Sequence, residues 1–166
     1  MRNALALQPE YKQPIIPQQE PPSDVASHLL EECRMVLPGI QALFGFQLIA
    51  VFNGKFWEMP DSHRILHLAA ITLVALAIAL VMTPAAYHRQ AHQFSISRQF
   101  IRLSSYLLLL SMFPLLAGIC IDFYLVADLV LAHSWWSGLL TAGLTMIFIS
   151  LWYVFPRMDF ARLDRL

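Results

Sequence analysis

A nearly uninterrupted apolar run of 22 residues, Ile65 to Ala86, is the strongest constraint on what this chain can fold into. At 1.5 Å per residue, a helix of that length crosses a hydrocarbon layer of about 30 Å. The apolar residues of a water-soluble domain instead fall in shorter, periodic patches. The run therefore predicts a transmembrane helix.

The composition supports lipid as the solvent, since 58% of the residues are hydrophobic and 13% are charged, against about 25% charged in an ordinary soluble domain. The formal net charge is zero. A nucleic-acid partner would need a concentrated basic face, so no such partner is expected.

Three further apolar blocks predict three more spans, which makes an all-α integral membrane bundle of four transmembrane helices within residues 25–156. A kink at Pro114 is tolerable where neighbouring helices satisfy the freed carbonyl, and we expect Pro156 to end the fourth span. Tryptophan and tyrosine near both ends of that span are typical of an aromatic belt. The four predicted spans cover residues 35–52, 65–86, 103–123 and 135–155.

The chain ends are predicted to lie outside the bundle. Residues 1–24 are rich in proline and polar side chains, which bury too little apolar surface to offset chain entropy, so this arm is expected to be disordered. It lacks the pattern of a cleaved signal peptide. Residues 157–166 form a short tail.

The distribution of lysine and arginine predicts the orientation. With four spans, both chain ends and the middle loop share one side, and that side holds nine of the eleven basic residues. Without Arg2 and Lys12, which are far from the first span, the split is seven to two, and the basic side is assigned to the cytoplasm. We therefore expect a bacterial plasma (inner) membrane protein with cytoplasmic N- and C-termini.

Two glutamines in the first span are polar groups that lipid cannot satisfy. Gln41 and Gln47 lie among Gly39, Ala42 and Gly45, small residues that let helices approach closely while an amide bonds across the contact. Helix association is the favoured interpretation. The alternative is a polar path, but the six-residue spacing separates the two amides by about 120° around the helix.

A structural clamp is predicted at the cytoplasmic mouth of the first two spans. Glu32 and Arg34, with Glu31 beside them, precede the first span, and His88 and Arg89 close the second. Arginine can hold a carboxylate bidentately where water is scarce. Anionic lipid headgroups are the competing partner for the arginines of the clamp, such as Arg89, and also for Arg98 and Arg102.

Two H-x-x-x-H pairs, His63 with His67 and His88 with His92, each place two imidazoles on one helical face, as a metal ion would need. Neither pair has the glutamate of H-E-x-x-H, so they are weak candidates for metal or haem ligation. Asp61 is the nearest third ligand for the first pair. No cofactor is predicted.

Asp122 and Asp128 interrupt the end of the third span. An ionisable residue within a membrane often marks an ion or proton path. Asp122 is about 29 Å along the axis from Leu103, near the interface, so a solvated helix end is favoured for both aspartates. The helix either continues past Asp122 or bends into the interface before His133.

No catalytic motif is present: the sequence has no phosphate-binding glycine loop, G-x-S-x-G elbow or paired C-x-x-C. We therefore do not expect an enzyme.

The first hairpin resembles an uncharacterised family of small bacterial membrane proteins. The resemblance runs from about Ser23 to Trp152 and rests on Glu32-Cys33-Arg34, the run Pro38 to Phe46, Pro84, and His88-Arg89. It implies a four-helix inner-membrane protein in which Glu32, Arg34, Gln41, His88 and Arg89 match the motif, without a known activity. Cys33 and Gln47 stand where that family usually has leucine, so the resemblance gives neither a role.

Three functions remain open. The favoured hypothesis is an accessory or interaction protein of the bacterial plasma membrane, with the bilayer and a second copy or another membrane protein as partners. A small oligomeric transporter or channel, motivated by Gln41, Gln47 and Asp122, is the main alternative. A haem- or metal-binding redox subunit is the third. The sequence discloses neither substrate nor oligomeric state.

Overall fold

The computed structural model describes residues 21–91, 98–132 and 134–158, and these ranges are almost entirely helical. The predicted all-α fold with four long helices is confirmed. The predicted arm lies outside the described residues up to position 20, as does the tail from position 159. The elements are α1 (Pro22–Ala50), α2 (Gly54–Trp57), α3 (Asp61–Ala91), α4 (Arg98–Val130), α5 (Trp135–Ile149) and a π-helical turn, η1 (Ser150–Val154).

Four helical stretches are long and apolar enough to cross a membrane by length and composition. They are Asp24–Ala50, Asp61–Gln90, Gln99–Val130 and Trp135–Met158. Large apolar side chains are exposed along all of them, Phe46, Leu68, Phe113 and Met146 among others. Such surfaces fit an apolar solvent better than water.

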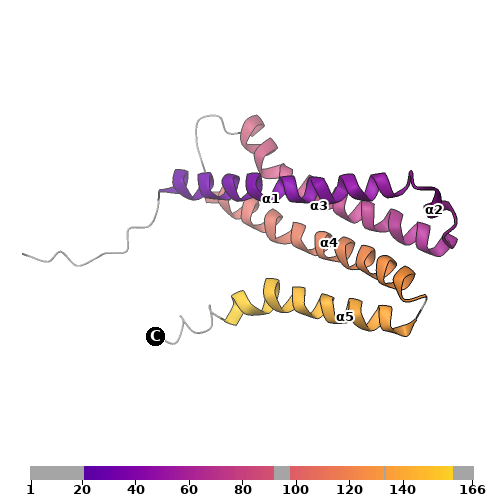
Figure 1. The fold of residues 1–166 in the computed structure, drawn as a ribbon. Helices are drawn as coiled ribbons and strands as arrows, with labels where there is room; N and C mark the ends of the chain where they lie inside the picture. Colours follow the sequence, from indigo (N-terminus) through magenta and orange to yellow (C-terminus); the bar gives the residue numbers. More distant parts are fainter. Residues whose placement is uncertain (1–20, 92–97, 133, 159–166) are drawn as a thin grey trace, which may run out of the picture.

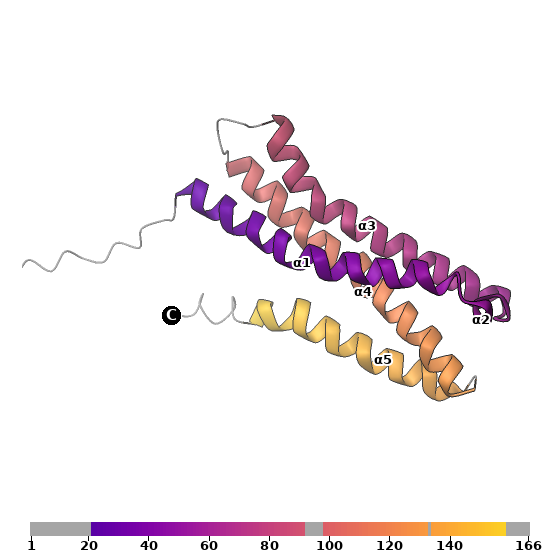
Figure 2. The ribbon, with the colours of Figure 1, turned by 45° about the horizontal axis from the view of Figure 1, so that its top comes forward.

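The helices run alternately up and down, with α3 and α4 as the central pair (Figures 1 and 2). α1 packs against both of them, whereas α5 packs mainly against α4. The short helix α2 lies where α1 gives way to α3, at the end of the bundle that also holds the end of α4 and the start of α5 (Figure 1). We call this the α2 end. The opposite end, where α1 begins and α3 ends, is the far end.

α3 and α4 approach closely at Gly118, where a methyl group on the glycine would lie 2.8 Å from Cγ2 of Val74. Val74 is fully buried and belongs to a core with Cys33, Ile40 and Val81. Only glycine lets the two backbones come this near, so this contact fixes the register of α3 against α4.

α4 continues as a helix past Asp122 to Val130. Of the two alternatives for the end of the third span, the helix therefore continues. The turn to α5 follows directly, and Ala132 within it has a positive φ of 52°. Ser134 then caps α5, its side chain accepting a hydrogen bond from the backbone N–H of Trp136. This tight turn brings the first residues of α5 beside the last turn of α4.

Pro156 does not end the last helix, contrary to the sequence-based expectation: helical residues continue to Met158. The π-helical turn of η1 ends at Val154, two residues before the proline, and includes Trp152, the residue four positions before it. In an α-helix the proline ring would clash with the carbonyl of the residue four positions earlier. A wider π turn shifts that carbonyl, so the helix passes the proline.

Candidate functional site

Two histidines of α3 face two aspartates of α4 at the α2 end. His63 and His67 are four residues apart and share one face of α3, while Asp122 and Asp128 are six residues apart on α4. Because α3 and α4 run in opposite directions, the earlier histidine meets the later aspartate. His63 pairs with Asp128 and His67 pairs with Asp122. We call this arrangement the His–Asp ladder.

The inner rung of the ladder joins three helices. Nδ1 of His67 lies 3.3 Å from Oδ1 of Asp122, and its Nε2 lies 3.0 Å from the backbone carbonyl oxygen of Gln47. The Gln47 side chain donates from Nε2 to the other oxygen of Asp122 at 2.5 Å. α1, α3 and α4 are therefore tied together by one polar cluster, with the ring of Phe56 packed edge-on against the imidazole.

Both ring nitrogens of His67 face oxygen acceptors, a carboxylate and a carbonyl. A neutral imidazole has one N–H and can satisfy only one of them, whereas the imidazolium donates from both nitrogens. A neutral His67 ring therefore leaves one of these two acceptors without a donor from the ring. The second carboxyl oxygen of Asp122 accepts the hydrogen bond of the Gln47 amide.

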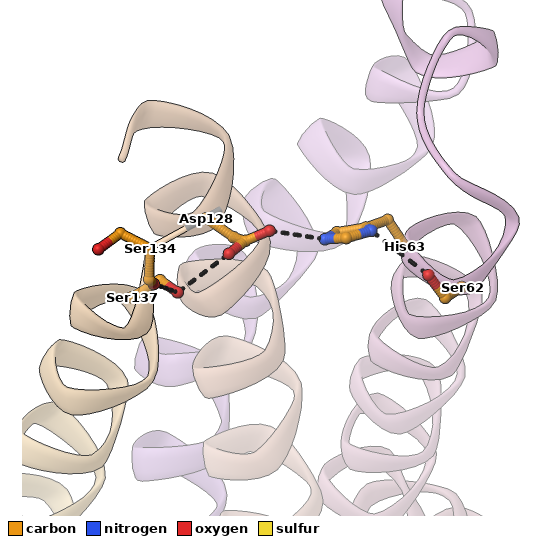
Figure 3. A network of polar contacts seen from close by, with 5 residues as sticks. All are labelled: Ser62, His63, Asp128, Ser134 and Ser137. Carbon is orange, nitrogen blue, oxygen red and sulfur yellow. Dashed lines mark hydrogen bonds and ion pairs between the residues drawn. The ribbon is translucent and has the colours of Figure 1, made fainter. Parts of the chain in front are cut away.

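The outer rung also joins three helices (Figure 3). Nε2 of His63 donates to Oδ2 of Asp128 at 2.9 Å, and the hydroxyl of Ser137, on α5, donates to Oδ1 at 3.0 Å. Asp128 thus lies between His63 of α3 and Ser137 of α5. Ser62 stands beside Nδ1 of His63 at 3.5 Å, the limit of a hydrogen bond. The ring of Tyr124 stacks parallel to His63.

The ladder is largely shielded from solvent. Asp128 is 5% exposed and His67 is 8% exposed. The interpretation of Asp128 as a solvated helix end is therefore wrong. The continuing helix carries it to the start of α5, where Ser137 covers it. Asp122 retains partial exposure, but it is bonded to Gln47 and His67 and is not a free helix end.

Two pockets open beside the ladder. One of about 430 Å³ is lined by His63 together with Lys55 and Glu58. A second of about 290 Å³ is lined by Gln47, His67 and Asp122 and is otherwise walled by apolar side chains of α1, α4 and the α2 segment. Lys55 and Glu58 therefore share a pocket with His63, and Asp61 and Arg64 share another pocket with His67.

His63 and His67, the predicted metal ligands, do not point toward a common position. Each imidazole points to its own carboxylate. Asp61, the predicted third ligand, instead pairs with Arg64. Within the described ranges, no group of three or more histidine, cysteine, aspartate or glutamate side chains could share a metal ion. His92, of the second pair, lies outside the described residues.

The motif residues of the first hairpin lie away from the ladder, towards the far end. Arg34, His88 and Arg89 line one pocket of about 410 Å³. Glu32 lines a neighbouring pocket on the α4 side of α1. Among the described side chains, no ion pair joins Glu31 or Glu32 to Arg34 or Arg89, so the structure brings the cations of the clamp together without its acids.

Three further predicted residues have separate positions. The side chain of Gln41 is exposed on α1, away from the buried Gln47. Arg102, a predicted lipid contact, is exposed on the first turns of α4. Arg98 begins α4, and its side chain is outside the described part of the structure.

Sequence reasoning missed the role of Ser137 and the pairing of each histidine with an aspartate. The available signal was the matched arrangement of two histidines near the start of one span and two aspartates near the end of the next. Antiparallel neighbours place such positions at the same depth. The serine carried no signal, because its contact depends on the α4–α5 turn.

The comparisons with known proteins identify a family but no activity. A family of unknown function, DUF6328, matches residues 25–156. The chain belongs to this family. The match covers the whole helical bundle, and the resemblance to an uncharacterised family is confirmed. No curated protein and no solved structure matches the chain.

Proposed function

We propose that this DUF6328 protein is a proton-responsive accessory protein of the bacterial plasma membrane, crossing the bilayer four times. The observation that carries the proposal is the His–Asp ladder, which ties α1, α3, α4 and α5 together through two imidazoles. Ionisable residues within membrane helices are costly unless paired, and chains of histidine and aspartate are typical of proton-linked membrane proteins.

The orientation follows from the basic residues. Seven arginines within reach of the spans belong to the side of the far end and only Lys55 and Arg64 to the α2 end, so the far end is proposed to be cytoplasmic. The ladder then faces the outer side of the membrane. It would sense the proton concentration outside the cell.

The direction of the response follows from the hydrogen bonds. A protonated imidazole gives a charge-assisted bond to its aspartate, and both nitrogens of His67 are satisfied. When the imidazole loses its proton, the aspartate keeps only a hydrogen bond from a neutral donor. Such a bond stabilises the carboxylate less than a charge-assisted one. Histidine changes charge between about pH 5 and 8. We therefore expect α3, α4 and α5 to be held together more firmly at the α2 end when the outer solution is acidic than when it is alkaline.

The test is a distance measurement between spin labels at Leu68→Cys on α3 and Gly138→Cys on α5. Both positions are exposed, and the native Cys33 and Cys120, both free, are replaced by serine. In lipid nanodiscs we expect one narrow distance distribution at about pH 5 and a broader or longer one at about pH 8.

Matched variants decide whether the ladder is the sensor. His63→Gln with His67→Gln should make the distribution independent of pH. His28→Gln, which removes an exposed histidine of α1 near the far end, should leave the response intact. A distribution that does not change with pH in the wild type would contradict the proton response.

The accessory role is tested separately by native mass spectrometry of protein extracted in a mild detergent. A defined complex that is recovered in lower yield at alkaline pH than at acidic pH would support the accessory role. The decrease should be smaller in the variant with both His63→Gln and His67→Gln. A stable monomer that retains neither protein nor lipid at either pH would contradict it.

A small oligomeric transporter is the second candidate, favoured by the cluster of Gln47, His67 and Asp122 at the wall of a pocket. It predicts solute or proton flux in liposomes that is lost in Asp122→Asn. If liposomes that contain the protein show no more flux than empty liposomes under varied gradients, the transporter hypothesis is wrong. The redox alternative has less support, since the two imidazoles of α3 are directed at separate carboxylates.

A further inference from the structure

Gln41 presents an amide to the surroundings of the bundle from the middle of α1. Its side chain is exposed, and among the described residues it makes no side-chain hydrogen bond. It follows Arg34 by seven residues and precedes Ala50, the end of α1, by nine. At 1.5 Å per residue these are about 10 Å and about 14 Å, so the amide lies deep within a hydrocarbon core of about 30 Å.

Two exposed hydroxyls of the second span form hydrogen bonds within their own helix. The hydroxyl of Thr72 donates to the carbonyl of Leu68 at 2.8 Å, and that of Thr83 donates to the carbonyl of Ala79 at 2.7 Å. Neither needs a partner outside its own helix. The Gln41 amide has two N–H donors and a carbonyl acceptor, and it forms no such hydrogen bond within its own helix. Lipid chains provide no hydrogen-bond partner either.

The surface around Gln41 permits another helix to come close. Gln41, Gly45 and Leu48 follow the three- and four-residue steps of one helical stripe, and Pro38 continues it. A methyl group at Gly45 would meet nothing within 4 Å, and the same holds for Gly39. These glycines therefore serve no close packing inside the chain, in contrast to Gly118.

We propose that this stripe of α1, Pro38, Gln41, Gly45 and Leu48, is the contact surface for a second copy of the chain, with the two Gln41 amides hydrogen-bonded to each other. An amide is its own complement, since it both donates and accepts. Two copies inserted the same way carry Gln41 at the same depth, and a two-fold axis brings the same stripe of each together. A different protein would need a polar group at that depth.

This dimer does not depend on the proton response, because Gln41 and the ladder lie on different faces of α1. Gln47, which joins α1 to the ladder, is six residues away and is directed into the bundle. The two proposals therefore fail independently. Loss of dimerisation with an intact pH response, or the reverse, identifies which one is wrong.

The test is self-association of the full chain in liposomes, measured by energy transfer between donor- and acceptor-labelled copies as the protein-to-lipid ratio is varied. The wild type is expected to dimerise. Gln41→Leu should weaken association by about tenfold, the scale of one interhelical polar contact, and Gln41→Asn should retain part of it. Gly45→Leu should weaken it by preventing close approach.

The matched controls are Thr72→Val and Gly143→Leu, at an exposed self-satisfied hydroxyl and at an open glycine of α5. Neither should change association. A cysteine at Leu48 should form a disulfide between copies in the membrane, whereas one at Leu68 should not. A wild type that stays monomeric at all ratios, or association unchanged in both Gln41→Leu and Gly45→Leu, overturns the proposal.

Discussion

Gly118 of α4 lies directly against Val74 of α3, so close that a single added methyl group would stand 2.8 Å from a valine methyl and 3.2 Å from the carbonyl oxygen of Ala70. This contact sets how the two central helices slide along each other. It therefore also sets whether His63 meets Asp128 and His67 meets Asp122.

Gly118→Ala is expected to destabilise the bundle by about 1–3 kcal/mol, because a buried valine in a helix has little rotamer freedom with which to give way. Thermal unfolding in detergent measures the loss. Gly143→Ala is the control, since nothing lies within 4 Å of that position. It should be neutral or slightly stabilising, and an equal effect of both variants would contradict the close contact.

Asp122→Leu is expected to destabilise by about 1–3 kcal/mol, because it removes one partner of a partly buried pair and leaves the Gln47 amide and one nitrogen of the imidazole without their acceptor. The double variant His67→Leu with Asp122→Leu should lose less than the sum of the two single variants. Unfolding of all four proteins gives the coupling. Strict additivity would mean that the two residues do not interact.

Ser137→Ala is expected to cost about 1–2 kcal/mol, because it removes the hydroxyl that donates to Asp128 and ties α5 to α4. The loss should appear first as protease sensitivity around the α4–α5 turn. Ser105→Ala, at an exposed position of α4, serves as the comparison and should be neutral. Equal protease resistance of Ser137→Ala and wild type would show that the bond does not hold α5.

Ala132→Gly is expected to stabilise the protein by up to about 1 kcal/mol, since Ala132 has a φ of 52°, where its Cβ is strained and glycine is not. Ala142→Gly, in the middle of α5, should instead destabilise by about 0.5–1 kcal/mol through loss of helix propensity. Both are read from the same unfolding curves. A destabilised Ala132→Gly would refute strain in this turn.

The sequence alone was sufficient for the four long helices, because helix length and apolar content are local properties of segments such as Ile65–Ala86. It also placed His63 and His67 on one face, since the helical period is fixed.

Only the tertiary structure decided what the polar residues do. Asp122 and Asp128 were expected at a solvated helix end because counting along the helix from Leu103 places Asp122 about 29 Å away, near the interface. In the structure they are bonded to residues 55 and 65 positions earlier in the chain. That pairing depends on the register of α3 against α4, which the close contact at Gly118 sets. It also depends on the turn at Ala132, which brings Ser137 over Asp128. Register and turn geometry arise from packing between segments, so no local pattern contains them.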